Sequence, residues 1–134
     1  MSLSDEERRI MVRLEMERAK RTLNEVEILK SAELWNGVSN RLYYAVYHAI
    51  SALLIHDGHQ VFTHHGSHAL FGQEYIKTGI MPADYGRLYN QLQTMREQSD
   101  YNCAFDADPE ELKMRIEPAR QMIETIEKMV DEHG

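Results

Sequence analysis

Apolar residues recur every three or four positions through most of the chain, and this spacing restricts the fold more than any other feature of the sequence. Near the N-terminus the apolar positions are Met16, Ala19, Leu23, Val26 and Leu29. Side chains at such steps share one face of an α-helix. Ser4 and Glu7 can form a capping box in front of this stripe, so we expect one amphipathic helix of roughly 25 residues to begin there.

A second and a third helix are predicted on either side of a loop. The second should span about residues 33–57 and end at Gly58, because glycine readily adopts the left-handed conformation that terminates helices. Its centre is apolar almost all round, which predicts a central position in the fold. We expect a loop over residues 56–65, and then a helix that is capped by Thr63 and closed by Gly79.

Two more helices are predicted in the second half of the chain. Pro82 should open the fourth, and a loop over residues 101–107 should follow it. The fifth has Asp108 as its N-cap and a proline in its first turn. Pro118 lies inside this last helix and removes a backbone hydrogen bond, but the apolar spacing continues in phase beyond it. We therefore expect a bend at Pro118 and not a break.

These elements predict an all-α fold. Connections of about 3 to 10 residues favour antiparallel neighbours, so the expected architecture is an up-and-down helical bundle of about five helices. The low counts of glycine (7) and proline (3) agree with a helical chain. The length of 134 residues suits a single domain, which we place over residues 1–134.

Charge and cysteine content exclude several classes of protein. Fifteen basic and 22 acidic residues give a net charge of −7, which counts against broad binding to a nucleic-acid backbone. The single cysteine, Cys103, cannot form an internal disulfide or a four-cysteine metal site. The N-terminus lacks the apolar run of a signal peptide, and no stretch reaches the roughly 18 to 20 apolar residues of a membrane span. We therefore expect a cytoplasmic protein with no membrane contact.

The segment from Asn40 to His48 is the most informative for function. Arg41 and His48 are seven positions apart, which returns them to nearly the same face of a helix with Tyr44 between them. An arginine offers a planar cation for a phosphate, and a histidine can exchange a proton near neutral pH. Together they could supply the groups for metal-free RNA cleavage. The alternative is structural: Arg41 pairs with a buried carboxylate, and His48 is a core histidine with its hydrogen bonds satisfied.

A second candidate cluster lies at the end of the fourth predicted helix. It contains Arg96, Asp100 and Tyr101. Asp100 could orient Arg41 or His48 through a charge-assisted hydrogen bond, and Tyr101 could meet a substrate group. In the structural alternative, Asp100 accepts backbone amides of the following loop while Tyr101 packs on the core.

Histidines form a third cluster around the predicted loop. His64 and His68 have the spacing of a two-histidine metal site, but no glutamate of an HExxH motif accompanies them and His65 lies between. His56 and His59 could join such a site only if the loop folded back. We expect no metal and no cofactor, and we interpret these histidines as loop and helix-start residues. As a second interpretation, they could face the bundle and contact a nucleotide.

Three runs of the sequence resemble the HEPN domain family (higher eukaryotes and prokaryotes nucleotide-binding), in a prokaryotic branch of it. The runs are NRLYYAVYHAISALL, THHGSHALFGQEYIKTG and MREQSDYN, and the likeness spans about residues 14–130. The resemblance implies a helical bundle, usually dimeric, in a family with many metal-independent ribonucleases of toxin-antitoxin or defence systems. The family signature is an arginine and a histidine with four to six residues between, and Arg41 and His48 match it with six. In active members a polar residue often follows the arginine, whereas Leu42 stands here and the polar Asn40 precedes.

Three functions compete on this reasoning. The first is a homodimeric endoribonuclease for single-stranded RNA, in which Arg41 and His48 are catalytic. Its expected substrate-binding residues are Asn40, Tyr44, Arg96, Asp100 and Tyr101. The second is a non-catalytic module that binds a nucleotide or a partner, such as a small nucleotidyltransferase or an antitoxin. The third is a bundle that only oligomerises.

Overall fold

The described residues fold into five α-helices that enclose one apolar core. The computed structural model describes residues 3–60 and 63–132, and this part of the chain contains no β-strand. Its helices are α1 (Asp5–Ser31), α2 (Trp35–His56), α3 (His64–Phe71), α4 (Ala83–Tyr101) and α5 (Pro109–Glu132), with a π-helical turn, η1 (Gly72–Ile76), that extends α3. The predicted all-α class is confirmed. No helix in the described ranges is both long and apolar enough to cross a bilayer.

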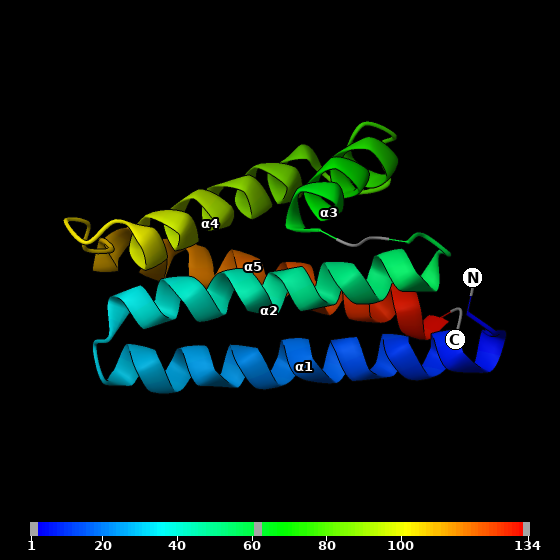
Figure 1. The fold of residues 1–134 in the computed structure, drawn as a ribbon, viewed down its shortest axis with the longest axis horizontal. Helices are drawn as coiled ribbons and strands as arrows, with labels where there is room; N and C mark the ends of the chain where they lie inside the picture. Colours follow the sequence, from blue (N-terminus) through cyan, green and yellow to red (C-terminus); the bar gives the residue numbers. More distant parts are fainter. Residues whose placement is uncertain (1–2, 61–62, 133–134) are drawn as a thin grey trace.

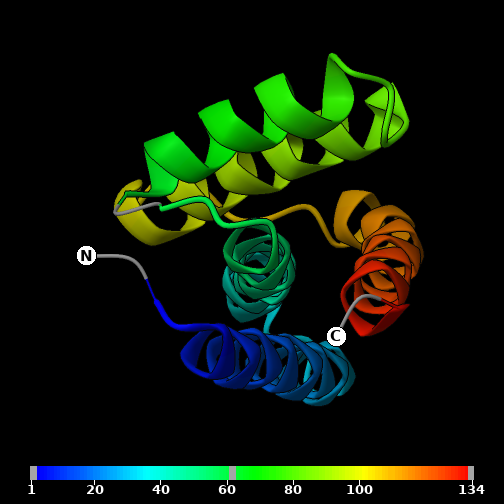
Figure 2. The same ribbon diagram turned by 90° about the vertical axis from the view of Figure 1, so that its right-hand side faces the viewer.

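Helix α2 lies at the centre of the bundle. Figure 1 shows α1, α2 and α5 running side by side, with α3 and α4 across the upper face of α2. The end-on view in Figure 2 shows α1 below α2, α5 on one side of it, and no described helix on the opposite side. The sequence predicted this central position from the apolar centre of α2. Most of that centre is buried, including Leu42, Tyr43, Val46, Ile50 and Leu53.

The side of α2 that no helix covers bears a stripe of half-buried residues. Arg41, Tyr44, His48 and Ser51 recur there at steps of three and four positions, with Tyr47 beside them. We call these five residues the α2 stripe. Because a helix repeats every 3.6 residues, the same spacing that buries the rest of α2 leaves this stripe at the surface.

The boundaries of α1 and α2 agree with the predicted capping residues, except at the start of α2. Ser4 Oγ accepts a hydrogen bond from the backbone N–H of Glu7, and the Glu7 carboxylate accepts from the Ser4 N–H, so the capping box is present. The second helix begins at Trp35 and not near residue 33, because Glu33 has a positive φ of 58° and belongs to the turn that ends α1. Gly58, with φ of 86°, ends α2 as predicted.

The later boundaries also follow the sequence closely. Thr63 caps α3 by accepting a hydrogen bond from the N–H of Gly66, and Pro82 precedes α4. Tyr101 is the last residue of α4, although it was expected to start the loop. The Asp108 carboxylate accepts from the Glu110 N–H, and α5 continues through Pro118 without a break.

Candidate functional site

The α2 stripe brings Arg41 and His48 to one face with an aromatic ring between them. The Cζ atom of Arg41 lies 5.3 Å from the centre of the Tyr44 ring, which in turn lies 6.4 Å from the centre of the His48 ring. Arg41 and His48 do not hydrogen-bond to each other, and both are partly exposed. A substrate group could therefore contact both side chains from outside without any helix moving.

A carboxylate from α1 orients the His48 ring. Nδ1 of His48 lies 2.8 Å from Oε2 of Glu15, and the two side chains are only 21% and 24% exposed. A carboxylate is an acceptor, so Nδ1 carries a hydrogen and Nε2 of the neutral ring is left with a lone pair. Within the described ranges Nε2 has no hydrogen-bond partner. The ring can thus take up or release a proton at Nε2 while the carboxylate holds the other side.

Arg41 is held by its neighbour in the chain and by a second carboxylate from α1. Its Nε and Nη2 donate to Oδ1 of Asn40 at 2.8 and 2.6 Å, and its Nη1 lies 3.5 Å from the Glu25 carboxylate. The Asn40 amide donates in turn to Oδ2 of Asp100 at 2.9 Å. Asp100 therefore acts on Arg41 through Asn40, and it does not contact His48. The alternative in which Asp100 accepts loop amides is wrong for the described residues.

Arg96 joins the α4 cluster to the α2 stripe. It is only 6% exposed, and its Cζ lies 4.9, 5.6 and 5.8 Å from the ring centres of Tyr43, Tyr44 and Tyr101. Its Nη1 lies 3.8 Å from Asp100, whereas its buried Nε has no partner in the described chain. The faces of three phenol rings stabilise the cation electrostatically. Tyr101 is 75% exposed, so the structural alternative in which it packs on the core is wrong.

Two histidines of α3, His64 and His68, face the bundle, while contact with a nucleotide stays a prediction. Nδ1 of His64 and Nε2 of His68 lie 3.0 and 3.2 Å from the hydroxyl oxygen of Tyr43. His68 stacks on Tyr89 with ring centres 3.6 Å apart, and burial lowers its pKa to about 4. Burial, followed by the nearby Arg96, also lowers the pKa of His64. Both rings are therefore neutral at pH 7.

The remaining histidines lie apart from this cluster. His65 is exposed, His56 pairs with Asp57 at 2.8 Å, and His59 lies against the Tyr75 ring. The described residues contain no group of three or more histidine, cysteine or acidic side chains that could hold a metal ion. His56 and His59 do not fold back to join His64 and His68.

Sequence reasoning missed the two glutamates of α1. Glu25 and Arg41 each lie eight positions from Glu33, which sits in the turn between α1 and α2. In an antiparallel helical hairpin, residues at similar distances from the turn lie opposite each other. This symmetry could have indicated Glu25 for Arg41, but for His48 it gives Arg18, so it would not have found Glu15.

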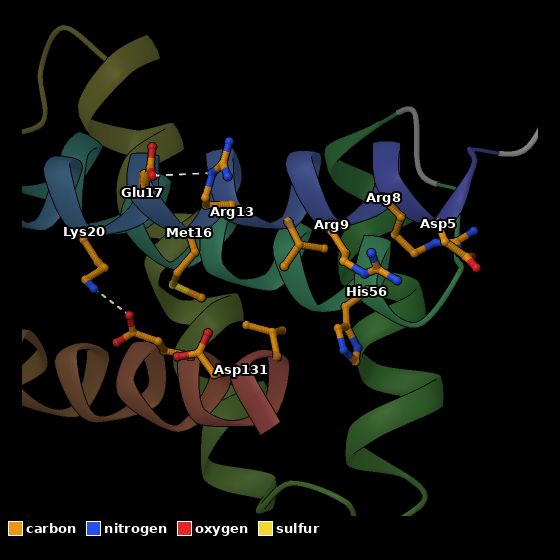
Figure 3. A pocket seen from close by; sticks show the side chains of 12 residues that line it. Asp5, Arg8, Arg9, Arg13, Met16, Glu17, Lys20, His56 and Asp131 are labelled. Atoms are coloured by element: carbon orange, nitrogen blue, oxygen red, sulfur yellow. Dashed lines mark hydrogen bonds and ion pairs between the residues drawn. The ribbon is translucent and has the colours of Figure 1, made fainter. Parts of the chain in front are cut away.

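A groove of about 700 Å³ lies elsewhere on the molecule, between the first half of α1 and the end of α5. Figure 3 shows arginines and lysine along its α1 wall, with Lys20 reaching a carboxylate of α5. Acidic residues line it as well, including Asp5, Glu17, Glu127 and Asp131. This mixture of signs offers little attraction to a polyanion, and no residue of the α2 stripe lines the groove.

Comparison with known proteins gives a consistent set of relatives. A family model described as the HEPN domain matches residues 12–129, a range that contains every residue of the α2 stripe and its partners. A UPF0332 protein of Thermotoga maritima is 31% identical over 115 residues, which cover 86% of this chain and 87% of that protein. Two proteins of Methanocaldococcus jannaschii, each named "putative toxin", are also similar. One is 27% identical over 87% of both chains. The other is 26% identical over 72% of this chain and 65% of its own.

Proposed function

The chain belongs to the HEPN domain family, and from that membership we propose that it is a metal-independent endoribonuclease of the toxin type. Arg41 and His48 are its catalytic residues in this proposal. The names of the two archaeal relatives support a toxin, and a toxin implies an antitoxin partner.

The contact between His48 and Glu15 is the observation that best supports the proposal. Metal-free RNA cleavage requires groups that take the proton of the attacking 2′-hydroxyl or give a proton to the leaving 5′-oxygen. A histidine that served only the core would bury both ring nitrogens against partners, whereas His48 keeps Nε2 open at the surface. Glu15 keeps the hydrogen of the neutral ring on Nδ1, so proton exchange with a substrate takes place at Nε2.

Arg41 supplies the positive charge for the phosphate in this proposal. Its guanidinium lies on the same stripe as His48, and its Glu25 contact is long at 3.5 Å and partly exposed. An incoming phosphate could replace that weak surface contact at little cost. Asn40 holds the guanidinium plane, and Asp100 holds Asn40.

The other predicted substrate-binding residues differ in how far their side chains are exposed to solvent. Tyr44 is half-buried between the two catalytic residues, and the exposed Tyr101 ring is available for stacking on a base. Arg96 is buried behind these rings, so its role is to position them and to add positive potential to the site. The net charge of −7 restricts the RNA contact to this local region.

A homodimer completes the proposal. Apolar side chains of α1 stand at the surface close to Glu15, among them Ile10, Met11 and Leu14. A second copy that covers these residues beside the α2 stripe would form a cleft for RNA between the subunits. Stable interfaces of this kind bury more than about 1,000 Å².

Variants of the two catalytic residues test the proposal. His48→Ala should slow cleavage of single-stranded RNA by about 10² to 10⁴-fold, the usual contribution of proton transfer. Arg41→Ala should also slow it strongly, because the phosphate loses its cation. Arg41→Lys should recover little, since lysine keeps the charge but loses the planar fork. Cleavage should persist in EDTA and should leave a 2′,3′-cyclic phosphate, and a 2′-deoxy substitution at the cut site should block it.

The second candidate is a non-catalytic module that binds a nucleotide or a partner nucleotidyltransferase. The acidic net charge and the pairing of Arg41 with Glu25 favour it. Equal activity of the wild-type protein and His48→Ala, with intact helical dichroism, would support this module and contradict the ribonuclease. Binding of a nucleotide without its cleavage, measured by calorimetry, would then identify the ligand.

A further inference from the structure

His64 reaches the α2 stripe from α3 and lies beside the same two tyrosines as His48. The ring centres of His64 and Tyr47 are 4.4 Å apart in a stacked arrangement, and the Tyr44 ring lies edge-on at 5.7 Å. His48 lies against the same rings, at 5.4 and 6.4 Å. Two imidazoles from different helices thus contact the same pair of tyrosine rings, Tyr44 and Tyr47. Both His64 and His48 are partly exposed.

A chain of hydrogen bonds determines which ring nitrogen of His64 can accept a proton. The side-chain oxygen Oδ1 of Asn90 accepts a hydrogen bond from Nδ1 of His68 at 3.0 Å. Nε2 of the neutral His68 ring is therefore an acceptor. That nitrogen accepts a hydrogen bond from the hydroxyl of Tyr43. Burial raises the pKa of this hydroxyl to about 12, so it keeps its hydrogen. The Tyr43 oxygen can then accept from Nδ1–H of His64. Nε2 of His64 is left with a lone pair and with no partner among the described residues.

The surroundings of the two histidines differ in charge. His48 donates from Nδ1 to the carboxylate of Glu15, which carries a negative charge. His64 donates from Nδ1 to a neutral phenol, that of Tyr43, and the buried guanidinium of Arg96 lies 4.9 Å from the centre of the same Tyr43 ring. Burial, followed by the positive charge of Arg96, lowers the pKa of His64 and so disfavours a second proton on its ring. The geometry therefore sets one imidazole against a carboxylate and the other against a neutral phenol.

We infer that His64 is a second catalytic residue and acts as the general base of the ribonuclease, with His48 as the general acid. The inference rests on the proposed ribonuclease activity. Nε2 of His64 takes the proton of the 2′-hydroxyl while the 2′-oxygen bonds to phosphorus. The bond from phosphorus to the 5′-oxygen breaks, and Nε2 of protonated His48 gives its proton to that oxygen. The products are a 2′,3′-cyclic phosphate and a 5′-hydroxyl, and no other reactant is consumed.

A substrate with a changed leaving group separates the two roles. The probe is a single-stranded RNA oligonucleotide that the wild-type protein cleaves, compared with the same RNA carrying sulfur in place of the 5′-bridging oxygen at the cut site. A thiolate leaves without a proton, so this substrate needs no general acid. On the ordinary RNA, His64→Ala and His48→Ala should each lose about 10² to 10⁴-fold in rate. On the sulfur-containing RNA, His48→Ala should regain most of its rate, whereas His64→Ala should stay slow.

Two further variants control for structure. His64→Asn keeps an N–H near the position of Nδ1 for the Tyr43 contact but has no nitrogen that titrates, so it should be as slow as His64→Ala. His65→Ala removes an exposed neighbouring histidine and should cleave like the wild-type protein. Wild-type rates for His64→Asn, or recovery of the His64 variants on the sulfur-containing RNA, would overturn the inference alone. Absence of cleavage by the wild-type protein, or normal cleavage by His48→Ala, would overturn the proposed function and the inference with it.

Discussion

Glu15 and His48 lie 33 positions apart in the sequence, yet the antiparallel packing of α1 on α2 brings the carboxylate oxygen within 2.8 Å of the ring nitrogen Nδ1. The two side chains form a contact between a carboxylate and an imidazole at the surface of the bundle. Arg41 lies on the same face of α2 as His48. The contact makes Glu15 a positioning residue for His48, because Glu15 holds the ring from the side away from the open nitrogen.

Removing the carboxylate should slow catalysis without unfolding the protein. Glu15→Gln cannot hold the imidazolium by charge, and its amide can donate to Nδ1 and so favour the wrong tautomer. We expect kcat for RNA cleavage to fall by about 10²-fold or more with KM little changed. Glu15→Asp should recover part of the loss. The matched control is Glu17→Gln, which removes an exposed glutamate of the same helix that pairs with Arg13. An equal effect of the two variants would argue against a positioning role.

His68 should make the protein less stable in mild acid. Burial lowers its folded-state pKa to about 4, whereas the unfolded chain has a pKa of about 6.5. The unfolded state therefore binds a proton first as the pH falls. The free energy of unfolding should drop between about pH 6.5 and 4, by about 1 to 2 kcal/mol after allowance for partial exposure. Urea denaturation of the wild-type protein at pH 7.5 and 4.5 measures this change.

The control for this acid effect is His68→Phe, which keeps an aromatic ring against Tyr89 but cannot titrate. Its stability should fall less than that of the wild-type protein over the same pH interval. The same acid loss in both proteins would assign the effect to other groups.

Arg96 should stabilise the fold through the rings around it. Arg96→Ala removes a buried cation that lies over the faces of Tyr43 and Tyr44 and leaves a cavity between α2 and α4. We expect the free energy of unfolding to decrease by about 2 kcal/mol or more. Arg87→Ala, which removes an exposed arginine of α4, should change it by less than about 0.5 kcal/mol. Similar urea midpoints for the two variants would contradict this account.

The exposed apolar residues of α1 should form part of the dimer contact. Leu14 is 48% exposed and stands next to Glu15, so Leu14→Glu should place a charge in the interface. Sedimentation at micromolar concentration should show a dimer for the wild-type protein and a 15.7 kDa species for the variant, with loss of cleavage. Met114→Glu, on the exposed side of α5, should remain dimeric. A wild-type monomer would exclude the shared cleft.

The positions of the helices could be predicted because their signals are local. The capping box at Ser4, the cap at Thr63 and the left-handed Gly58 act within a few residues of themselves, and each lies where the sequence indicated. Glu33 was missed because a glutamate with positive φ is unusual, and only the packing of α1 against α2 requires the turn there.

The placement of Arg41 and His48 on one face also follows from the sequence by itself, since seven positions are nearly two turns of any α-helix. Which carboxylates meet them was decided by the tertiary structure, because the register between α1 and α2 depends on how two whole apolar faces interlock. For the same reason only the structure separates His64, which faces Tyr43 and Tyr47, from the exposed His65 next to it. Spacing along one helix is fixed by backbone geometry, whereas contacts between helices are set by the packing of side chains far apart in the chain.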